Sequence, residues 1–271
     1  MRRLRIAVPG PLTGPRAAYG EVIRAAVAGF ATAPELDLRL LDDQAQPALA
    51  VRVAAAIVEG GADVVIGHFN SDCARAAIPI YRAAGIPLLL PASTAPGLAD
   101  GQGVFRLCAD ESRQVDAMAV LLRNELGDRK PSVWSDGSAY ARRLRLQLEA
   151  AVGRVLDDAP PPDEPAMGAN CAVVYLGAHV AVRARLHQEG SNWSGVAVCC
   201  DDCAIDDFKL QVRSGTWICT PHRHYGQLLE EAVRVAHRVL LLRASRWNEV
   251  FDAHGEHRAA AWHLSRTEKE C

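Results

Sequence analysis

Residues 86–96, IPLLLPASTAP, place an aliphatic segment directly before a proline, small residues and hydroxyls. The part from Ile86 to Leu90 is typical of a short strand that is buried on both faces. The residues that follow, Ala92, Ser93 and Thr94, offer a backbone carbonyl, amides and two hydroxyls. The stretch therefore predicts either an ordinary turn or a polar site at the end of a buried strand.

Short aliphatic strands alternate with helical patterns on both sides of this stretch. In the first half of the chain we expect strands at 4–8, 36–41, 62–67, 86–90 and 104–107. In the second half we expect them at 132–134, 172–177, 196–200 and 216–220. Amphipathic segments lie between them, among them 19–32, 47–60, 71–84, 112–126, 138–152 and 178–189. This alternation predicts an α/β fold of two successive lobes, each with a parallel sheet.

The two series of strands set the expected lobe boundaries. The first lobe is predicted to hold residues 1–112 with 226–271, and the second residues 113–225. The apolar stretch 224–243 is predicted to be one long helix. Residues 157–168, DDAPPPDEPAMG, are expected to form a loop because they are too polar and too rich in proline for a helix or strand.

Composition narrows the class of protein. The 271 residues are 49% hydrophobic and 23% charged, which suits a sizeable core, and the net charge is −2. This charge offers no basic face for nucleic acid and no polybasic segment for a membrane surface. The apolar stretch near the start, MRRLRIAVPG, has only the length of a strand, so a cytoplasmic location is expected, or a periplasmic one if a leader has been removed.

Three loops are expected to open at one edge of the first sheet. They are VPGPLTGPRAAYG (8–20), GHFNSDC (67–73) and PASTAP (91–96), and each follows a predicted strand. Ligands of open α/β sheets sit at the carboxyl ends of the parallel strands. Ser71 and Thr94 each stand near a possible helix start, where amides and hydroxyls hold an anion. A carboxylate ligand is therefore predicted, with simple helix capping as the alternative.

Several short motifs carry a resemblance to a known family. They are PLTG followed by YG (11–14, 19–20), DDQAQP (42–47), VIGHFNS (65–71) and PASTAP (91–96). In these residues the chain resembles the type I periplasmic binding proteins of the leucine/isoleucine/valine-binding family. The likeness spans 4–115 and continues more weakly through 130–225. It implies two Rossmann-like lobes, joined by a three-strand hinge, that close on a ligand.

The resemblance also implies roles for individual residues. Ser71 and Thr94 would hold the α-carboxylate of an amino acid, and the carbonyl of Ala92 would hold its α-ammonium together with Asp201. Tyr19 and Tyr140 would stack over the ligand, Phe69 would line its side-chain pocket, and Ser93 lies inside the same motif. Alternatives stay open at two positions: Asp202 adjoins Asp201, and Tyr140 can be a packing residue. Ala178 stands where a tyrosine of the second lobe is expected, and its neighbour His179 is either a contributor or a surface residue.

The chain departs from this family in several ways. A disulfide of some members would fall on Ala45 and Asn70, so that bridge is absent. The second lobe is trimmed: one helix is replaced by the loop 157–168, and no strand is expected after the long helix. Because much of the circumference of helix 224–243 is apolar, we expect uncovered surface there, and hence a homodimer or a protein partner.

Three functions are weighed on these observations. The first is a cytosolic binding or sensor module for an amino acid or a related zwitterion or amide. The second is a transport binding protein without its leader, and the third is a pathway enzyme or accessory protein that reuses the cleft. The sequence has no HExxH, phosphate loop, GxGxxG or nucleophile elbow. We therefore expect a binding module with no enzymatic activity and no cofactor.

Cysteines suggest one competing interpretation. The chain has eight of them, and Cys200 and Cys203 form a CxxC pair. With Cys219 and His222 they could supply four zinc ligands, although the second pair lacks the spacing of a known zinc motif. Free cysteine is also a common small core residue. Inert thiols and no metal are therefore expected.

Overall fold

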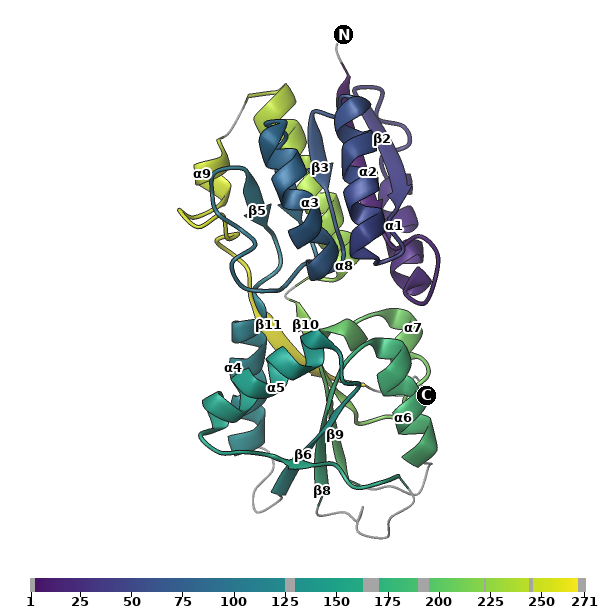
Figure 1. The fold of residues 1–271 in the computed structure, drawn as a ribbon, viewed down its shortest axis with the longest axis vertical. Helices are drawn as coiled ribbons and strands as arrows, with labels where there is room; N and C mark the ends of the chain where they lie inside the picture. Colours follow the sequence, from purple (N-terminus) through teal and green to yellow (C-terminus); the bar gives the residue numbers. More distant parts are fainter. Residues whose placement is uncertain are drawn as a thin grey trace. The chain divides into compact units, whose positions relative to one another are not determined.

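The computed structural model describes residues 3–124, 130–162, 171–189, 195–221, 223–243 and 246–267. The chain forms two α/β units (Figure 1). Unit 1 comprises Met1–Asp110 with Arg223–Ala261, and unit 2 comprises Glu111–His222 with Trp262–Cys271. The predicted α/β class with parallel sheets is confirmed. The observed division differs from the expected boundaries mainly at the C-terminal end, where the residues from Trp262 onward group with unit 2.

Unit 1 is built on a five-stranded sheet in the order β2-β1-β3-β4-β5, and all its pairings are parallel. Its strands are β1 (Leu4–Gly10), β2 (Leu36–Asp42), β3 (Val64–Ile66), β4 (Leu88–Leu90) and β5 (Val104–Arg106). Its helices are α1 (Ala17–Ala28), α2 (Pro47–Glu59), α3 (Ser71–Ala83), α8 (Tyr225–Ala236) and α9 (Trp247–Val250). The central strands β3 and β4 are wholly buried, as expected for parallel strands with helices on both faces.

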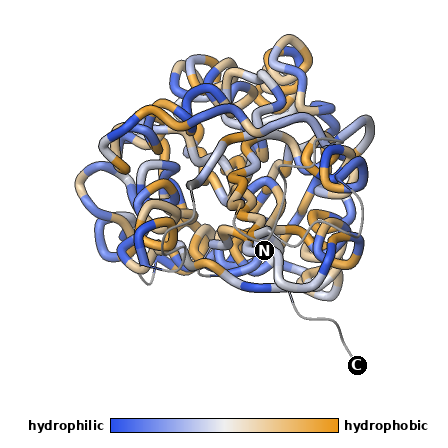
Figure 2. The backbone as a smooth tube through the Cα atoms, turned by 90° about the horizontal axis from the view of Figure 1, so that it is seen from below, coloured by the Kyte–Doolittle hydropathy of each residue, from blue (hydrophilic) through white to orange (hydrophobic). Residues whose placement is uncertain are grey.

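The helices of unit 1 show why these segments fold as they do. Helix α2 begins with Pro47, whose missing amide would have no intrahelical acceptor there, and Gly60 ends it. Its buried residues Ala50, Val53, Ala54 and Ile57 follow the helical spacing and join the core. Figure 2 shows hydrophobic and hydrophilic residues interspersed along the backbone. The helices therefore cover the sheet with their apolar stripes.

Unit 2 has a six-stranded sheet in the order β11-β10-β9-β8-β6-β7. Its strands are β6 (Lys130–Ser135), β7 (Asp157–Asp158), β8 (Cys171–Leu176), β9 (Val196–Cys199), β10 (Trp217–Pro221) and β11 (Trp262–Arg266). Its helices are α4 (Glu111–Asn124), α5 (Ala139–Val152), α6 (His179–Glu189), a 3-10 turn (Asp201–Cys203) and α7 (Asp206–Lys209). Its five parallel strands, in the order β7-β6-β8-β9-β10, repeat the order of unit 1, because the second strand along the chain lies outside the first in both sheets. The order reverses between β1 and β3 in unit 1, and between β6 and β8 in unit 2.

Two expectations about unit 2 are wrong. A strand does follow the long helix, because Trp262–Arg266 pairs antiparallel with β10 over five residues. Sequence reasoning missed β11 because its nearest pairing partner is distant in the chain: Trp262 pairs with Pro221, 41 residues earlier. The stretch expected to be a loop from 157 also starts with a short strand: Asp157 and Asp158 pair parallel with β6. Residues 163–170 of that stretch lie outside the described residues.

The long helix predicted at 224–243 is shorter and better covered than expected. Helix α8 ends at Ala236 and continues as a π-helical turn, His237–Leu241. Its apolar residues Leu228, Leu229, Ala232, Val233, Val235 and Ala236 are at most 1% exposed. Contacts with α1 and β3 of the same unit cover them. The apolar residues of α8 are therefore covered within unit 1, whereas Leu242, at the end of the predicted helix, is 58% exposed. Among the described residues, none of the helices is both long and apolar enough to cross a membrane.

Candidate functional site

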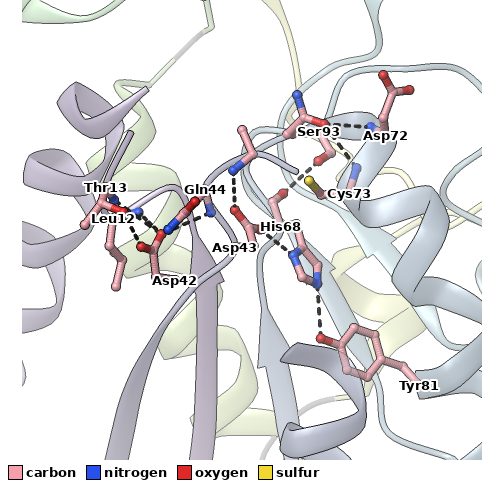
Figure 3. A network of polar contacts seen from close by, with 12 residues as sticks. Leu12, Thr13, Asp42, Asp43, Gln44, His68, Asp72, Cys73, Tyr81 and Ser93 are labelled. Carbon is pink, nitrogen blue, oxygen red and sulfur yellow. Dashed lines mark hydrogen bonds and ion pairs between the residues drawn. The ribbon is translucent and has the colours of Figure 1, made fainter. Parts of the chain in front are cut away.

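Loops that follow β1 and β2 are tied together at the carboxyl edge of the unit 1 sheet (Figure 3). Asp42, the last residue of β2, accepts hydrogen bonds from the amides of Leu12, Thr13 and Gln44, at 2.9, 3.3 and 3.0 Å. The Thr13 hydroxyl donates to its other oxygen at 2.5 Å. Partial burial opposes ionisation, but these hydrogen bonds outweigh it and lower the pKa of Asp42. The carboxylate thus holds the loop after β1 in place.

A buried network lies below the same edge (Figure 3). The Nδ1 atom of His68 is 2.6 Å from Oδ2 of Asp43, and its Nε2 atom is 3.1 Å from the Tyr81 hydroxyl. All three side chains are almost fully buried. Burial and the nearby Asp43 charge raise the pKa of Tyr81. Sequence reasoning did not find this network. The only signal was a polar residue directly after each of two strands, and the pattern could not show that both turn inward.

The loop after β4, which contains the predicted ligand residues, is anchored to this network. The Ser93 hydroxyl donates to the carbonyl of His68 at 2.7 Å and is fully buried. The Ala95 amide donates to Oγ of Ser71 at 3.2 Å, and Nη1 of Arg106 donates to the Ala95 carbonyl at 2.7 Å. These bonds fix the backbone from Ser93 to Ala95. The Ser93 side chain is therefore engaged within unit 1.

Helix capping does not account for Ser71 or Thr94. The N-cap of α3 is Asn70, whose Oδ1 accepts from the amides of Asp72 and Cys73 at 3.0 and 3.1 Å. No helix follows Thr94, because Pro96 and Gly97 form a turn and the chain continues to β5. The expectation of a helix start there is wrong.

Two predicted groups at this edge stand apart from the hydrogen bonds described above. Within the described part of the chain, neither the Thr94 hydroxyl nor the Ala92 carbonyl makes a hydrogen bond. Thr94 is 4% exposed and Ala92 is 9% exposed. Buried polar groups are normally hydrogen-bonded. These two are therefore available to a ligand, Thr94 as a donor and Ala92 as an acceptor.

Tyr19 and Phe69 pack against their own unit. The Tyr19 ring is 5.7 Å from the ring of Tyr225, and the guanidinium of Arg16 is 5.8 Å from its centre. Phe69 lies over Gly10 at the end of β1: a Cβ added to Gly10 would be 3.1 Å from the Phe69 ring. Both rings are 3% exposed. Both side chains are therefore packed inside unit 1, next to the carboxyl edge of its sheet.

In unit 2, the predicted residues Tyr140 and Asp201 come together. Asp201 begins the 3-10 turn after β9, and its Oδ1 accepts from the Tyr140 hydroxyl and, at 2.7 Å, from Nε2 of Gln114. The Asp201 amide donates to Oε1 of Gln114 at 2.9 Å. Burial and the Asp201 charge raise the pKa of Tyr140. Sequence reasoning missed Gln114, which is one polar residue within an amphipathic helix.

The structure separates the two neighbouring aspartates. Oδ2 of Asp202 accepts from the His179 amide at 2.7 Å and lies 3.0 Å from Nδ1 of the same residue. Asp202 therefore accepts the hydrogen bond of the first amide of helix α6, whereas Asp201 faces Tyr140 and Gln114. His179 is 1% exposed, so it is not a surface residue. The Ala178 amide donates to Oδ2 of Asp136 at 2.8 Å.

Four cysteines at or beside the alternative metal site are buried thiols. Cys199, Cys200, Cys203 and Cys219 are all fully buried, and Sγ of Cys200 donates to the Gly177 carbonyl at 3.2 Å. Burial and the adjacent thiols of Cys199 and Cys200 raise the pKa of Cys203. Among the described residues, no group of three or more His, Cys, Asp or Glu side chains could hold a metal ion. His222, the fourth ligand of the alternative metal site, lies outside the described residues.

Each unit has a sheet with five parallel strands in the same order and polar groups at its carboxyl edge, where open α/β sheets bind ligands. A family model described as periplasmic binding protein matches residues 3–166, more than half of the chain. The chain belongs to this family, and the resemblance predicted from its motifs is confirmed.

Named relatives agree with this assignment. The chain is 28% identical over 204 residues to the Leu/Ile/Val-binding protein homolog 3 of Brucella melitensis, a match that covers 69% of this chain and 55% of the relative. It is 28% identical over 160 residues to the leucine-, isoleucine-, valine-, threonine-, and alanine-binding protein of Pseudomonas aeruginosa, covering 55% and 43%. The chain thus spans about half the length of the curated relatives it matches.

Solved structures share the fold across nearly the whole chain. The branched-chain amino acid transporter substrate binding protein LivJ of Streptococcus pneumoniae, in complex with isoleucine, aligns with a TM-score of 0.79. The alignment covers 98% of this chain and 100% of that one at 17% identity. At this identity the likeness shows the fold alone.

Proposed function

We propose that the chain is a binding protein for a small α-amino acid, with leucine, isoleucine and valine as the first ligands to test. One observation carries the proposal: the carboxyl edges of the two units offer complementary chemistry. Unit 1 offers the unpaired hydroxyl of Thr94 beside the N-terminal turn of α3, which suits a carboxylate. Unit 2 offers the buried carboxylate of Asp201, which suits an ammonium group.

Each predicted residue has a role in this proposal. Thr94, Ser71 and the first amides of α3 bind the α-carboxylate, and Asp201 binds the α-ammonium together with the Ala92 carbonyl. Tyr140 orients Asp201 through its hydroxyl and presents its ring to the ligand. Phe69 and Tyr19 supply apolar surface, and Ser93 holds the backbone of its loop.

The choice of branched-chain amino acids rests on the relatives. Several matching proteins are named for binding leucine, isoleucine and valine. The family name favours the periplasmic alternative over the cytoplasmic one, which has no support from the comparisons. We therefore place the chain in substrate delivery for a membrane transporter ahead of cytosolic sensing, and we propose binding without catalysis. A homodimer is not part of the proposal, since α8 is covered within unit 1.

Calorimetry with three matched ligands tests the proposal. Leucine carries both charges, leucinamide lacks the carboxylate, and 4-methylpentanoate lacks the ammonium. We expect leucine to bind at least about 100-fold more tightly than either analogue, because each lost charge leaves a buried partner unsatisfied. Equal binding of all three, or no binding of leucine, isoleucine and valine, would contradict the proposal.

A further inference from the structure

Unit 1 contains a large cavity away from its carboxyl edge. Its volume is about 880 Å³, and it lies at the amino ends of β4 and β5, beside Pro87 and Gly103. Helix α9 and the residues after it form its other wall. Small-molecule sites commonly measure roughly 300–1,000 Å³. The cavity therefore has the size of a ligand site, at the opposite edge of the sheet from the proposed amino-acid site.

Flat aromatic faces line this cavity. The rings of Phe105 and Trp247 are stacked, with centroids 4.8 Å apart and planes 20° apart. Phe251 packs against both, at 5.0 Å from Phe105 and 6.3 Å from Trp247. Phe105 and Phe251 are buried, whereas Trp247 remains partly exposed. The accessible part of Trp247 can stack on a planar ring.

Positive charge predominates around these rings. Arg82, Arg246 and Arg258 line the cavity, against a single acidic residue, Asp252. Arg82 is paired with Asp100 at 2.6 Å. In the described part of the chain, Arg246 and Arg258 form no ion pair with a carboxylate. Oδ1 of Asp252 accepts from the amides of His254 and Glu256, at 2.9 and 3.0 Å. Nη2 of Arg258 donates to the Asn248 carbonyl at 3.2 Å, and the Arg258 charge helps to lower the pKa of Asp252. The other N–H groups of Arg258 and the Arg246 guanidinium can meet an anion.

Two glycines leave the cavity open. A Cβ atom added to Gly85 or to Gly103 would meet nothing within 4 Å. Gly103 has no left-handed backbone conformation, so a side chain there would bring no backbone strain. A Cβ atom at Gly103 therefore has open space around it, and a large side chain there would be placed among the lining residues of the cavity.

We propose that this cavity binds a small organic anion with a planar ring, the chemistry shared by nucleoside monophosphates and aromatic carboxylates. The ring stacks on Trp247, and the anionic group pairs with Arg246 and Arg258, since a guanidinium binds phosphate and carboxylate alike. The proposal does not depend on the amino-acid site, because the two sets of residues differ.

Calorimetry on the full chain tests the proposal with four probes. AMP and indole-3-acetate carry both ring and anion, adenosine carries only the ring, and inorganic phosphate carries only the anion. We expect AMP or indole-3-acetate to bind with Kd below about 1 mM, and adenosine and phosphate to bind at least about tenfold more weakly. Which of the first two binds identifies the anionic group. Failure of both, or equal binding of phosphate, would overturn the proposal.

Variants locate the binding. Gly103→Phe is expected to abolish binding of the preferred probe while leaving leucine binding unchanged, which also separates this proposal from the first. The double variant Arg246→Gln with Arg258→Gln is expected to lower the affinity for the probe by about tenfold or more. Arg39→Gln removes an exposed arginine of unit 1 that does not line the cavity and is the matched control. An unchanged affinity in Gly103→Phe, with an unchanged melting temperature, would place the probe elsewhere and overturn the proposal.

Discussion

The carboxyl edges of the two sheets share a strand order but use their acidic residues in opposite ways. In unit 1, Asp43 turns inward to the buried His68, and the edge keeps hydroxyls and amides. In unit 2, Asp201 stays at the edge, oriented by Gln114 and Tyr140. The topology decides where the loops meet, and the direction of each carboxylate decides which charge the edge can bind.

The largest expected effect comes from breaking the inward-facing pair of unit 1. His68→Leu would remove the imidazole partner of the buried Asp43 carboxyl group and leave it only the Ala45 amide. We expect a loss of about 3–5 kcal/mol in the unfolding free energy, because a buried charge loses its compensation. Urea denaturation measures it, with the exposed His254→Leu as the matched control. A loss below about 1 kcal/mol would show that the pair does not stabilise this edge.

The edge carboxylate of unit 2 is expected to matter for binding. Asp201→Asn should lower the affinity for leucine by about 100-fold, since the ammonium group loses its charged partner. Calorimetry checks the change, and affinity for leucinamide should fall in parallel. Asp202→Asn is the control: it affects the start of α6 and should change leucine affinity by less than about threefold. Similar losses in both variants would remove the distinction between the two aspartates.

The Thr94 hydroxyl at the edge of unit 1 is expected to contribute less. Thr94→Val keeps the shape of the side chain and removes its unpaired hydroxyl. We expect leucine affinity to fall by about tenfold, the contribution of one hydrogen bond to a charged group. The preference for leucine over leucinamide should shrink with it. Thr32→Val, at an exposed position, is the control. An unchanged preference in Thr94→Val would assign the carboxylate to another group.

The smallest effect concerns pH and the Asp42 turn. The pKa of Asp42 lies below its ordinary value of 3.8, so its stabilisation is complete above that value and is lost as the pH falls through the folded-state pKa. Wild type should therefore be more stable than Asp42→Asn at about pH 6, and the gap should close towards about pH 3. Urea titrations across this range measure the gap. A gap that widens on acidification would contradict the assignment.

Some features were accessible from local sequence patterns. The aliphatic runs of β3 and β4 and the helical spacing of α2 predicted the alternation of strands and helices. A strand buried on both faces is a continuous apolar run, whereas a helix buried along one stripe has apolar residues at every third or fourth position. The motif residues Thr94 and Asp201 could be proposed from the resemblance. β11 could not be found, because its strand character depends on pairing with β10 across the chain.

By itself, the sequence determined the two α/β units, the loops at the carboxyl edges and the polar residues that those loops carry. Only the tertiary structure decided which polar residues turn inward. It paired Asp43 with His68 and Asp202 with His179, and left Asp201 with Tyr140 and Gln114. Neighbouring aspartates look alike in a sequence. Their partners come from strands and helices distant along the chain, and the cost of leaving a buried charge unpaired selects one arrangement.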